Sequence, residues 1–232
     1  MNPIIAVEGI SFAGKTTLTK ILELQGFARL YELSEKFEYG ALFPHFPKNT
    51  EEAKQSDLWF IEQEVIRECD AQTKAMKYPV IADRSFISGL AFGYARQQVF
   101  ALGDANYQHK IIKQVLEEGN IHIPWLVHLK SDINLFLERK RKDCGRRIKE
   151  YGKEAVENVG INKYERKFFE KQLEFYARFF SRVSHLELDA RISPYELAAQ
   201  LKAWFHTLNA PFSSLNLEDI IVKNADDEKW IL

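Results

Sequence analysis

A glycine-rich stretch near the start of the chain limits its fold more than any other feature. The apolar run Ile4–Val7 leads into GISFAGKTT, residues 9–17, whose glycines, lysine and threonine have the spacing of a Walker A motif. The glycines let successive backbone N–H groups point at an anion, the lysine adds a positive charge, and the threonine hydroxyl can bind Mg²⁺. Apolar residues then recur at helical spacing over residues 18–24, so the motif lies between a strand and a helix, as a phosphate-binding loop does.

Every residue of this loop is a candidate ligand for the phosphates of a nucleoside triphosphate. The set is Gly9, Ile10, Ser11, Phe12, Ala13, Gly14, Lys15, Thr16 and Thr17. Within it, Lys15 is placed to hold the β- and γ-phosphates and Thr16 to bind the metal ion. A chance glycine-rich turn is the alternative, and the strand and helix on either side argue against it.

The order of the remaining elements indicates an α/β fold. We expect five strands, at 4–7, 28–33, 78–83, 121–129 and 186–188, with helices that include 50–77, 86–102, 105–118 and 161–182. Strands that alternate with helices favour a five-stranded parallel sheet sandwiched by helices. The proline- and aromatic-rich stretch 34–49 predicts an irregular loop. We therefore predict one P-loop NTPase domain over residues 1–209 and a C-terminal tail at 210–232.

Composition argues against several classes of partner. The 232-residue chain carries a formal net charge of −1, which gives no overall field to attract nucleic acid or an anionic membrane. No apolar stretch approaches membrane-spanning length, and we expect no signal peptide because the N-terminus enters a strand at once. Cys69 and Cys144 are interpreted as reduced thiols of a cytoplasmic protein. The six histidines show no metal-ligand spacing, and we interpret His122 and His128 as packing or surface residues.

A second group of candidate residues follows the strand predicted at 78–83, in the stretch VIADRSFISGLAF, residues 80–92. Functional side chains of parallel α/β sheets gather at the carboxyl ends of the strands, so Asp83 can face the glycine-rich loop. We predict that Asp83 holds Mg²⁺ together with Thr16, and that Arg84 binds an oxygen or phosphate of an acceptor. The alternative is an ordinary surface ion pair at the end of a strand.

A third group is the basic stretch ERKRKDCGRRIK, residues 138–149. Transfer of a phosphoryl group needs positive charge near the γ-phosphate and exclusion of water, so we predict a lid over about residues 138–152. Arg139 would face the site, and Gly145 would end the helix and leave Arg146 and Arg147 able to swing inward. A solvated basic helix or a nucleic-acid-binding patch is the alternative.

These three groups, in this order, resemble the thymidylate kinase and deoxynucleoside kinase branch of the P-loop kinases. The strongest likeness to thymidylate kinases is Asp83-Arg84 followed by Ser88-Gly89, Ala91-Phe92 and Ala95-Arg96, and looser similarity extends over residues 4–205. The resemblance implies ATP and Mg²⁺ as cofactors. It also implies that Asp189 and Ala190, after the last strand, lie near the adenine.

The departures from the family pattern concern the acceptor. Thymidylate kinases usually carry an aspartate where this chain has Ser11, and an arginine after the second strand where it has Tyr31-Glu32-Leu33-Ser34. The family's phosphate-contacting arginine on the long helix has no clear match, although Arg67 could substitute. Lost cations favour an uncharged, nucleoside-like acceptor. In deoxynucleoside kinases, a glutamate at the position of Glu32 activates or orients the 5′-hydroxyl. Those kinases also usually carry a Glu-Arg-Ser motif, and this chain has Asp83-Arg84-Ser85 in its place.

The acceptor pocket is expected to combine aromatic planes with amide and guanidinium groups, which suit a stacked, hydrogen-bonded base. Its predicted lining comprises Phe37, Tyr39, Phe43, Trp59, Phe60, Gln63, Arg67, Arg84, Phe92 and Arg96, although any one of the aromatic residues could belong to the core. The predicted catalytic residues are Lys15, Arg84, Glu32, Arg139, Arg146 and Arg147.

The sequence as a whole predicts an ATP-dependent kinase that transfers the γ-phosphoryl group to a nucleoside monophosphate such as dTMP. One alternative is a deoxynucleoside kinase that phosphorylates a 5′-hydroxyl, and another is a P-loop ATP-binding protein with a different acceptor. A GTPase is disfavoured because NKYE, residues 162–165, follows no predicted buried strand and no Asp-x-x-Gly switch follows the first strand. The apolar run Leu58–Ile61 would also suit a homodimer interface.

Overall fold

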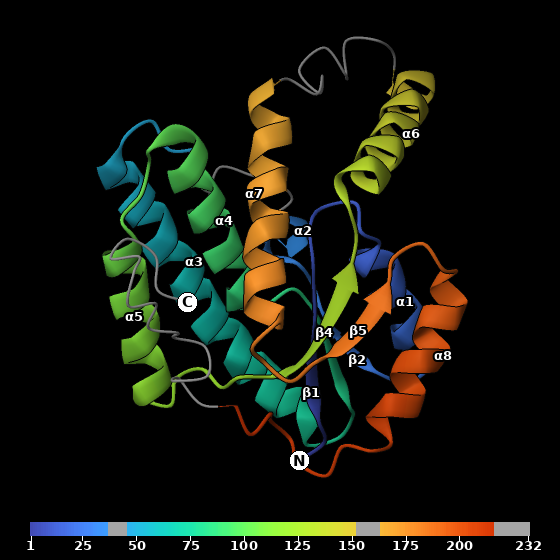
Figure 1. Ribbon diagram of the computed structural model, residues 1–232. Helices are drawn as coiled ribbons and strands as arrows, with labels where there is room; N and C mark the ends of the chain where they lie inside the picture. Colours follow the sequence, from blue (N-terminus) through green and yellow to red (C-terminus); the bar gives the residue numbers. More distant parts are fainter. Residues whose placement is uncertain (37–45, 152–162, 216–232) are drawn as a thin grey trace.

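The structure is a computed structural model that describes residues 1–36, 46–151 and 163–215. These residues form a five-stranded parallel sheet with helices on both faces (Figure 1), which confirms the predicted α/β fold. The strand order is β2 (Ala28–Leu30), β3 (Val80–Asp83), β1 (Ile4–Glu8), β4 (Trp125–Lys130) and β5 (Leu186–Asp189).

The central strand β1 fixes the register of the sheet. Val7 of β1 aligns with Asp83 of β3 on one side and with Val127 of β4 on the other. All five residues of β1 are buried, as expected for a parallel strand covered on both faces. The carboxyl ends of β1 and β3 therefore lie side by side, and the loops that follow them share one edge of the sheet.

The helices form two layers. On one face lie α1 (Lys15–Leu24) and α8 (Pro194–Phe205), and on the other lie α3 (Thr50–Ala75), α4 (Phe86–Phe100), α5 (Ala105–Glu117) and α7 (Lys163–Phe180) (Figure 1). The short helix α2 (Leu33–Lys36) follows β2, and α6 (Ile133–Tyr151) projects beyond the carboxyl edge of the sheet. Side-chain caps fix several helix starts, including Ser193, which forms a capping box with Glu196 at the start of α8.

Three local predictions were wrong. The strand predicted at 28–33 ends at Leu30, because Leu33 begins α2. The strand predicted at 121–129 begins only at Trp125, after Pro124, which has no backbone N–H to donate to a ladder. Helix α6 continues through Gly145 to Tyr151, since a glycine inside a helix costs only about 1 kcal/mol.

The C-terminal segment that the structure describes lies across the amino ends of the strands. Pro211 O accepts a hydrogen bond from the backbone of Ile4 at 2.8 Å, and Ala210 O accepts one from Trp125 Nε1 at 2.9 Å. The first residues of the predicted tail thus pack against the sheet, while residues 216–232 lie outside the described part of the chain. No helix in the described ranges is long and apolar enough to cross a membrane.

Candidate active site

The glycine-rich loop joins β1 to α1, and both of its glycines have backbone angles that only glycine adopts readily. Gly9 has φ +140° and Gly14 has φ +105°. A Cβ atom on Gly9 would lie 2.7 Å from Leu129 O of the neighbouring strand, so a side chain there would also clash. The loop can therefore curl against β4 and direct its N–H groups, with the start of α1, toward an anion.

Lys15 is buried at the first residue of α1, and its ammonium donates a hydrogen bond to Ile10 O at 2.8 Å. The pKa of Lys15 is lowered to about 8, mainly by burial and then by the nearby charge of Arg84, against the opposing effect of Asp83. The ammonium thus spans the loop as a charge that solvent screens poorly. A phosphate that entered the loop would find this charge already in place.

Asp83, at the end of β3, is fully buried and directed at the start of α1. Its Oδ2 accepts a hydrogen bond from Thr16 Oγ1 at 2.6 Å, and Arg29 Nη2 lies 3.6 Å from the same oxygen. Its Oδ1 is buried and has no hydrogen-bond partner among the described residues. A carboxylate with one unpaired oxygen beside a threonine hydroxyl is a donor set that suits Mg²⁺, so the residues fit the ion that the loop implies.

Arg84 connects the loop, β2 and α4. Its backbone is in the left-handed region, with φ +70°, and its guanidinium reaches the loop. The guanidinium donates to Glu32 Oε1 at 2.7 Å, to Gly9 O at 3.1 Å, and to the hydroxyls of Ser11 and Ser88 at 3.2 Å each. The hydroxyl of Ser11, at the position where thymidylate kinases usually have an aspartate, thus accepts a hydrogen bond from this arginine.

Glu32 lies just after β2 and pairs with Arg84 at the mouth of a cavity. Burial alone would raise the pKa of Glu32, but the charges of Arg84 and Lys15 and the hydrogen bond from Arg84 together hold it below its ordinary value. The carboxylate is therefore ionised at neutral pH. An ionised carboxylate beside the phosphate-binding loop can accept a proton from a hydroxyl group.

Glu8 was not among the predicted site residues, but its hydrogen bonds help to position Arg84. It is fully buried at the end of β1, and its carboxylate accepts hydrogen bonds from Ser85 N and Oγ, Ser88 Oγ and Tyr176 OH. Burial raises the pKa of Glu8. These bonds tie the start of α4, and hence Arg84, to the central strand.

A cavity of about 280 Å³ opens beside Glu32 and Arg84, between α3, α4, α5 and α7. Its lining includes Phe46, Phe60, Phe86, Phe92 and Phe168, together with Glu32, Asp57, Glu64, Arg67, Arg84, Arg96 and Gln108. Of the predicted acceptor residues, Phe60, Arg67, Arg84, Phe92 and Arg96 line this cavity. Trp59 and Gln63 do not, and Phe37, Tyr39 and Phe43 lie outside the described residues.

Each arginine that lines the described part of this cavity is paired with a carboxylate. Arg67 pairs with Glu64 at 2.5 Å, Arg84 pairs with Glu32, and Arg96 Nη2 donates to Asp57 Oδ2 at 2.6 Å. The formal charges in the lining therefore balance. The sequence prediction missed Asp57 and Glu64. Both lie on the same face of α3 as Phe60, because the three residues are three and four positions apart.

Gln108 of α5 was also missed, and no short-range signal points to it. Its Nε2 donates to Gly89 O at 3.1 Å and lies 3.4 Å from Asp57 Oδ1. Its amide approaches so closely that a Cβ on Gly93 would lie 2.4 Å from Gln108 Oε1. Only packing of α5 against α4 brings this amide to the cavity.

We expect Asp57→Ala to destabilise the protein by about 3–5 kcal/mol, because it leaves the buried Arg96 without its charge partner. The matched control is Asp70→Ala, on the same helix. Asp70 pairs with Lys74 at 2.6 Å but is half exposed, so its loss should cost under about 1 kcal/mol. Urea unfolding measures both values, and equal costs for the two variants would contradict the burial argument.

The basic helix α6 contacts the phosphate loop through Arg139. Its guanidinium donates to Phe12 O at 3.0 Å and also bonds to Ala13 O and Ala190 O, which ties α6 to the turn after β5. Arg146 faces solvent and pairs with Asp143 at 2.6 Å, and the side chain of Arg147 lies outside the described set.

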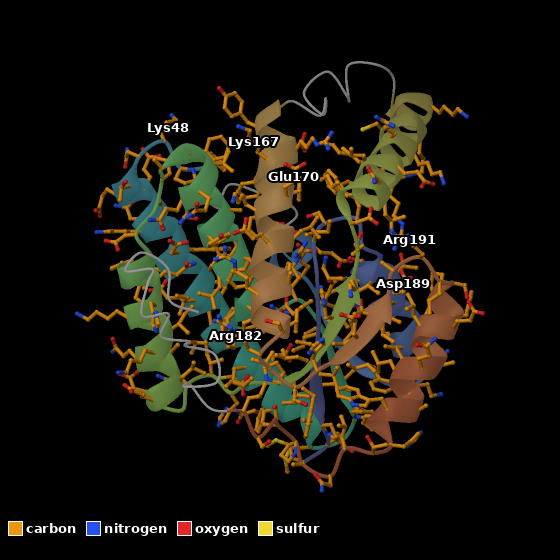
Figure 2. All side chains as sticks on the ribbon, in the orientation of Figure 1. Lys48, Lys167, Glu170, Arg182, Asp189 and Arg191 are labelled. Carbon is orange, nitrogen blue, oxygen red and sulfur yellow. The ribbon has the colours of Figure 1, made fainter. Side chains whose placement is uncertain are left out.

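The turn after β5 closes the opposite side of the loop. Figure 2 shows Asp189, the last residue of β5, and Arg191 just beyond it, near the base of α6. Asp189 Oδ1 accepts a hydrogen bond from the backbone of Arg191 at 2.9 Å, and Ala190 is buried. The predicted adenine-side residues therefore lie next to Arg139, at the same edge of the sheet as the loop.

Comparisons with known proteins place this architecture among nucleoside and nucleotide kinase folds. No family model matches the sequence, and no curated protein matches it. Two solved structures of deoxyadenosine kinase from M. mycoides match closely in fold. In the structure with dCMP and dCDP bound, the match covers 88% of this chain and 99% of the kinase, with a TM-score of 0.58 and 16% sequence identity. In the structure with dATP bound, it covers 87% of this chain and 98% of the kinase, with a TM-score of 0.61 and 15% sequence identity.

A thymidylate kinase from Candida albicans matches equally well, covering 91% of this chain and 97% of its own at a TM-score of 0.59 and 13% identity. Identities this low establish the shared fold and leave the reaction to be argued from the site. The fold is thus the thymidylate and deoxynucleoside kinase-like P-loop fold that the motifs predicted.

Proposed function

We propose that this protein is an ATP-dependent kinase that phosphorylates a hydroxyl group of an uncharged, nucleoside-like molecule. The observation that carries the proposal is the position of Glu32. This ionised carboxylate is held by Arg84 between the phosphate-binding loop and an aromatic-lined cavity, and the arginines of the described lining are all paired. That arrangement suits removal of a proton from an acceptor hydroxyl during phosphoryl transfer.

The donor side is supplied by the loop and its neighbours. The loop N–H groups and Lys15 would hold the β- and γ-phosphates of ATP, and Arg139 would carry positive charge to the rim of the loop. Thr16 and Asp83 would hold Mg²⁺, which neutralises phosphate charge when it is bound. Asp189 and Ala190 would flank the adenine, as in the family that the sequence resembles.

On the acceptor side, the aromatic residues would stack a planar base, and Glu32 would accept the hydroxyl proton as the oxygen attacks the γ-phosphorus. The bond from that phosphorus to the β-γ bridging oxygen of ATP breaks, ADP leaves, and the acceptor gains one phosphoryl group. Arg84, bonded both to Glu32 and to the loop backbone, would keep the base and the donor in one geometry. Catalysis then depends on positioning and charge.

The charge balance of the cavity favours a neutral acceptor over a nucleoside monophosphate. A phosphate would have to draw an arginine away from a carboxylate only 2.5–2.7 Å away, and would meet Glu32 and Glu64 as like charges. The monophosphate prediction retains one favourable observation, which is that three arginines do reach the cavity. Phosphorylation of dTMP is therefore the second candidate function.

An ADP-release assay with a panel of acceptors tests the proposal. Thymidine, deoxyadenosine, deoxycytidine and deoxyguanosine would each be compared with their 5′-monophosphates in the presence of ATP and Mg²⁺, with mass spectrometry of the products. We expect stimulation by at least one nucleoside and formation of its monophosphate. Stimulation by monophosphates alone would support the second candidate, and ADP release that no acceptor changes would count against both.

The pKa of Lys15 predicts how ATP binding depends on pH. The lysine is charged below its pKa of about 8 and loses its charge as the pH rises through that value, so ATP binding above pH 8 must be coupled to proton uptake. We expect the affinity for ATP to fall about tenfold between pH 7.5 and pH 9. Calorimetry at several pH values measures this affinity. The variant Lys15→Met should bind ATP weakly, and its affinity should not fall over the same pH range. A parallel decline in both proteins would assign the pH effect to another group.

A further inference from the structure

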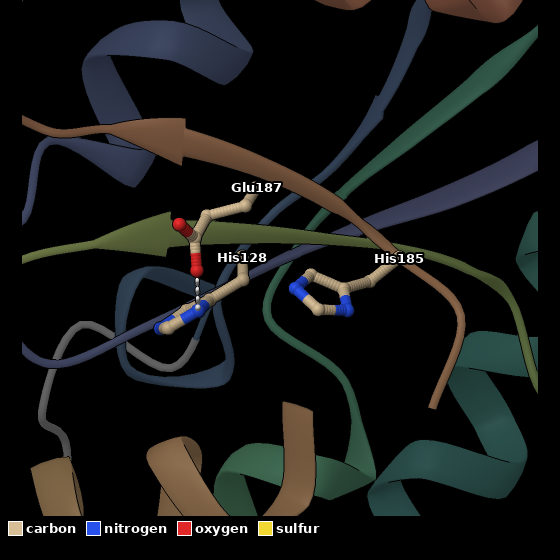
Figure 3. A group of neighbouring side chains, drawn as sticks. All are labelled: His128, His185 and Glu187. Atoms are coloured by element: carbon tan, nitrogen blue, oxygen red, sulfur yellow. Dashed lines mark ion pairs between the residues drawn. The ribbon is translucent and has the colours of Figure 1, made fainter. Parts of the chain in front are cut away.

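Three metal-ligating side chains that belong neither to the phosphate loop nor to the lining of the acceptor cavity meet on the sheet. His128 lies in β4, Glu187 lies in β5, and His185 just precedes β5. His128 and Glu187 are register partners on adjacent parallel strands, and His185 and Glu187 are two residues apart, so all three point to the same face. Figure 3 shows the carboxylate and both rings on that face.

The donor atoms of this cluster are close and available. One ligand atom from each residue lies within 4.8 Å of the others. The imidazole of His128 is 8% exposed, and its Nδ1 has no hydrogen-bond partner among the described residues; the nearest carboxylate oxygen, Glu187 Oε2, is 3.9 Å away. His185 makes a 2.8 Å contact from Nδ1 to Val183 O, in which Nδ1–H donates and Nε2 keeps its lone pair.

The surroundings hold these donors in place. The ring of Phe180 stacks on His128 at a centroid distance of 4.3 Å and packs against His185 at 4.6 Å. Lys130 donates to Glu187 Oε1 at 2.9 Å, which leaves Oε2 facing His128. The backbone carbonyl of Val183 fixes the His185 ring, in the way that outer-shell carbonyls orient metal-bound histidines.

We propose that His128, His185 and Glu187 form a binding site for a divalent transition metal ion, with Zn²⁺ as the ion that the donor set suits best. Two imidazoles and one carboxylate are a common ligand set for zinc sites that keep a fourth position open. Tetrahedral Zn²⁺ bonds of 2.0–2.1 Å place neighbouring ligand atoms about 3.3 Å apart, so the donors must draw together. His185 is half-buried and Glu187 exposed, so rotation of these two side chains can close the gap.

The site is distinct from the site of the proposed kinase chemistry, because none of its residues belongs to the phosphate loop or to the described lining of the acceptor cavity, although His128 is the register partner of Glu8. It is nevertheless connected to that chemistry through the core. His128 packs against the ring of Tyr176 at 5.8 Å, and the hydroxyl of Tyr176 contacts Glu8 and Ser88 beneath Arg84. A metal ion that fixed the His128 ring would therefore act on the packing beneath the active site.

Metal titration of the full chain tests the proposal without any measurement of activity. The protein would be treated with chelator and dialysed, then titrated with Co²⁺ by visible absorption and with Zn²⁺ by calorimetry. We expect one ion per chain, tetrahedral Co²⁺ bands without thiolate charge transfer, and at least tenfold weaker binding in His185→Ala and in Glu187→Gln. The matched control His206→Ala, at the exposed end of α8, should bind like the parent.

The remaining variants make the outcome decisive. His128→Ala can disturb packing against Phe180, so His185→Ala and Glu187→Gln, whose residues are more exposed, decide the result if His128→Ala does not fold. Lys130→Ala should bind the metal more tightly, because it removes a competing cation from Glu187. Absence of binding, unchanged affinity in His185→Ala and Glu187→Gln, or thiolate bands from Cys69 or Cys144 would overturn the proposal.

Discussion

Lys15→Ala is expected to lower ATP-dependent phosphoryl transfer by about 10²–10³-fold, the loss typical of removing one group that stabilises developing charge in a dry site. Among the described residues, the ammonium makes one hydrogen bond, to Ile10 O, and burial already disfavours its charged form. Its removal should therefore leave the fold intact, as judged by circular dichroism and thermal melting. The rate of ADP release at saturating acceptor measures the effect.

Lys20→Ala provides a matched control on the same helix. The Lys20 side chain is 56% exposed and lies 3.7 Å from Glu35, so its loss removes a lysine from α1 without touching the loop. We expect its turnover to stay within about twofold of the parent, because exposed ion pairs contribute little. Turnover retained by Lys15→Ala, or lost equally in both variants, would contradict the assignment of the loop as the ATP site.

Much of the fold could be predicted because its determinants are local. The loop that begins at Gly9 needs particular backbone angles, and the strand before it and the helix after it show clear periodicity. The errors occurred where tertiary contacts override local preference. Leu33 has strand-like neighbours but packs as the start of α2, and Gly145 stays helical because α6 continues on both sides of it.

The acceptor side was predicted only in part, because its residues come together from separate helices. Phe60 and Arg67 were identified on α3, but two carboxylates of the same helix were not: Asp57, which pairs with Arg96, and Glu64, which pairs with Arg67. A charged residue in a helix is ordinarily assigned to solvent. Gln108 reaches the cavity only through packing of α5 on α4.

The histidine cluster was missed for the same reason. His128 and His185 are far apart in sequence, and only the parallel register of β4 and β5 brings them together. Spacing along the chain carries no signal of that kind.

With a nucleoside acceptor, Glu32→Gln is expected to lower kcat by about 10²–10⁴-fold, the usual contribution of a positioned base. This loss can exceed the one expected for Lys15→Ala. The amide keeps the shape of the carboxylate and can still accept a hydrogen bond from Arg84, so the KM for ATP should change little. Glu35→Gln, three residues along on α2, is the matched control, because Glu35 pairs with Arg29 and does not line the cavity.

This substitution also distinguishes the two candidate functions, because a monophosphate acceptor attacks through an oxygen that is already ionised and needs no base. If dTMP is the true acceptor, Glu32→Gln should raise turnover or leave it unchanged, since it removes a like charge from the path of the phosphate. Arg84→Ala should lower turnover in either case, and in the double variant with Glu32→Gln the two losses should not add if the residues act as a pair. Additive losses would show that Arg84 serves the donor loop independently of Glu32.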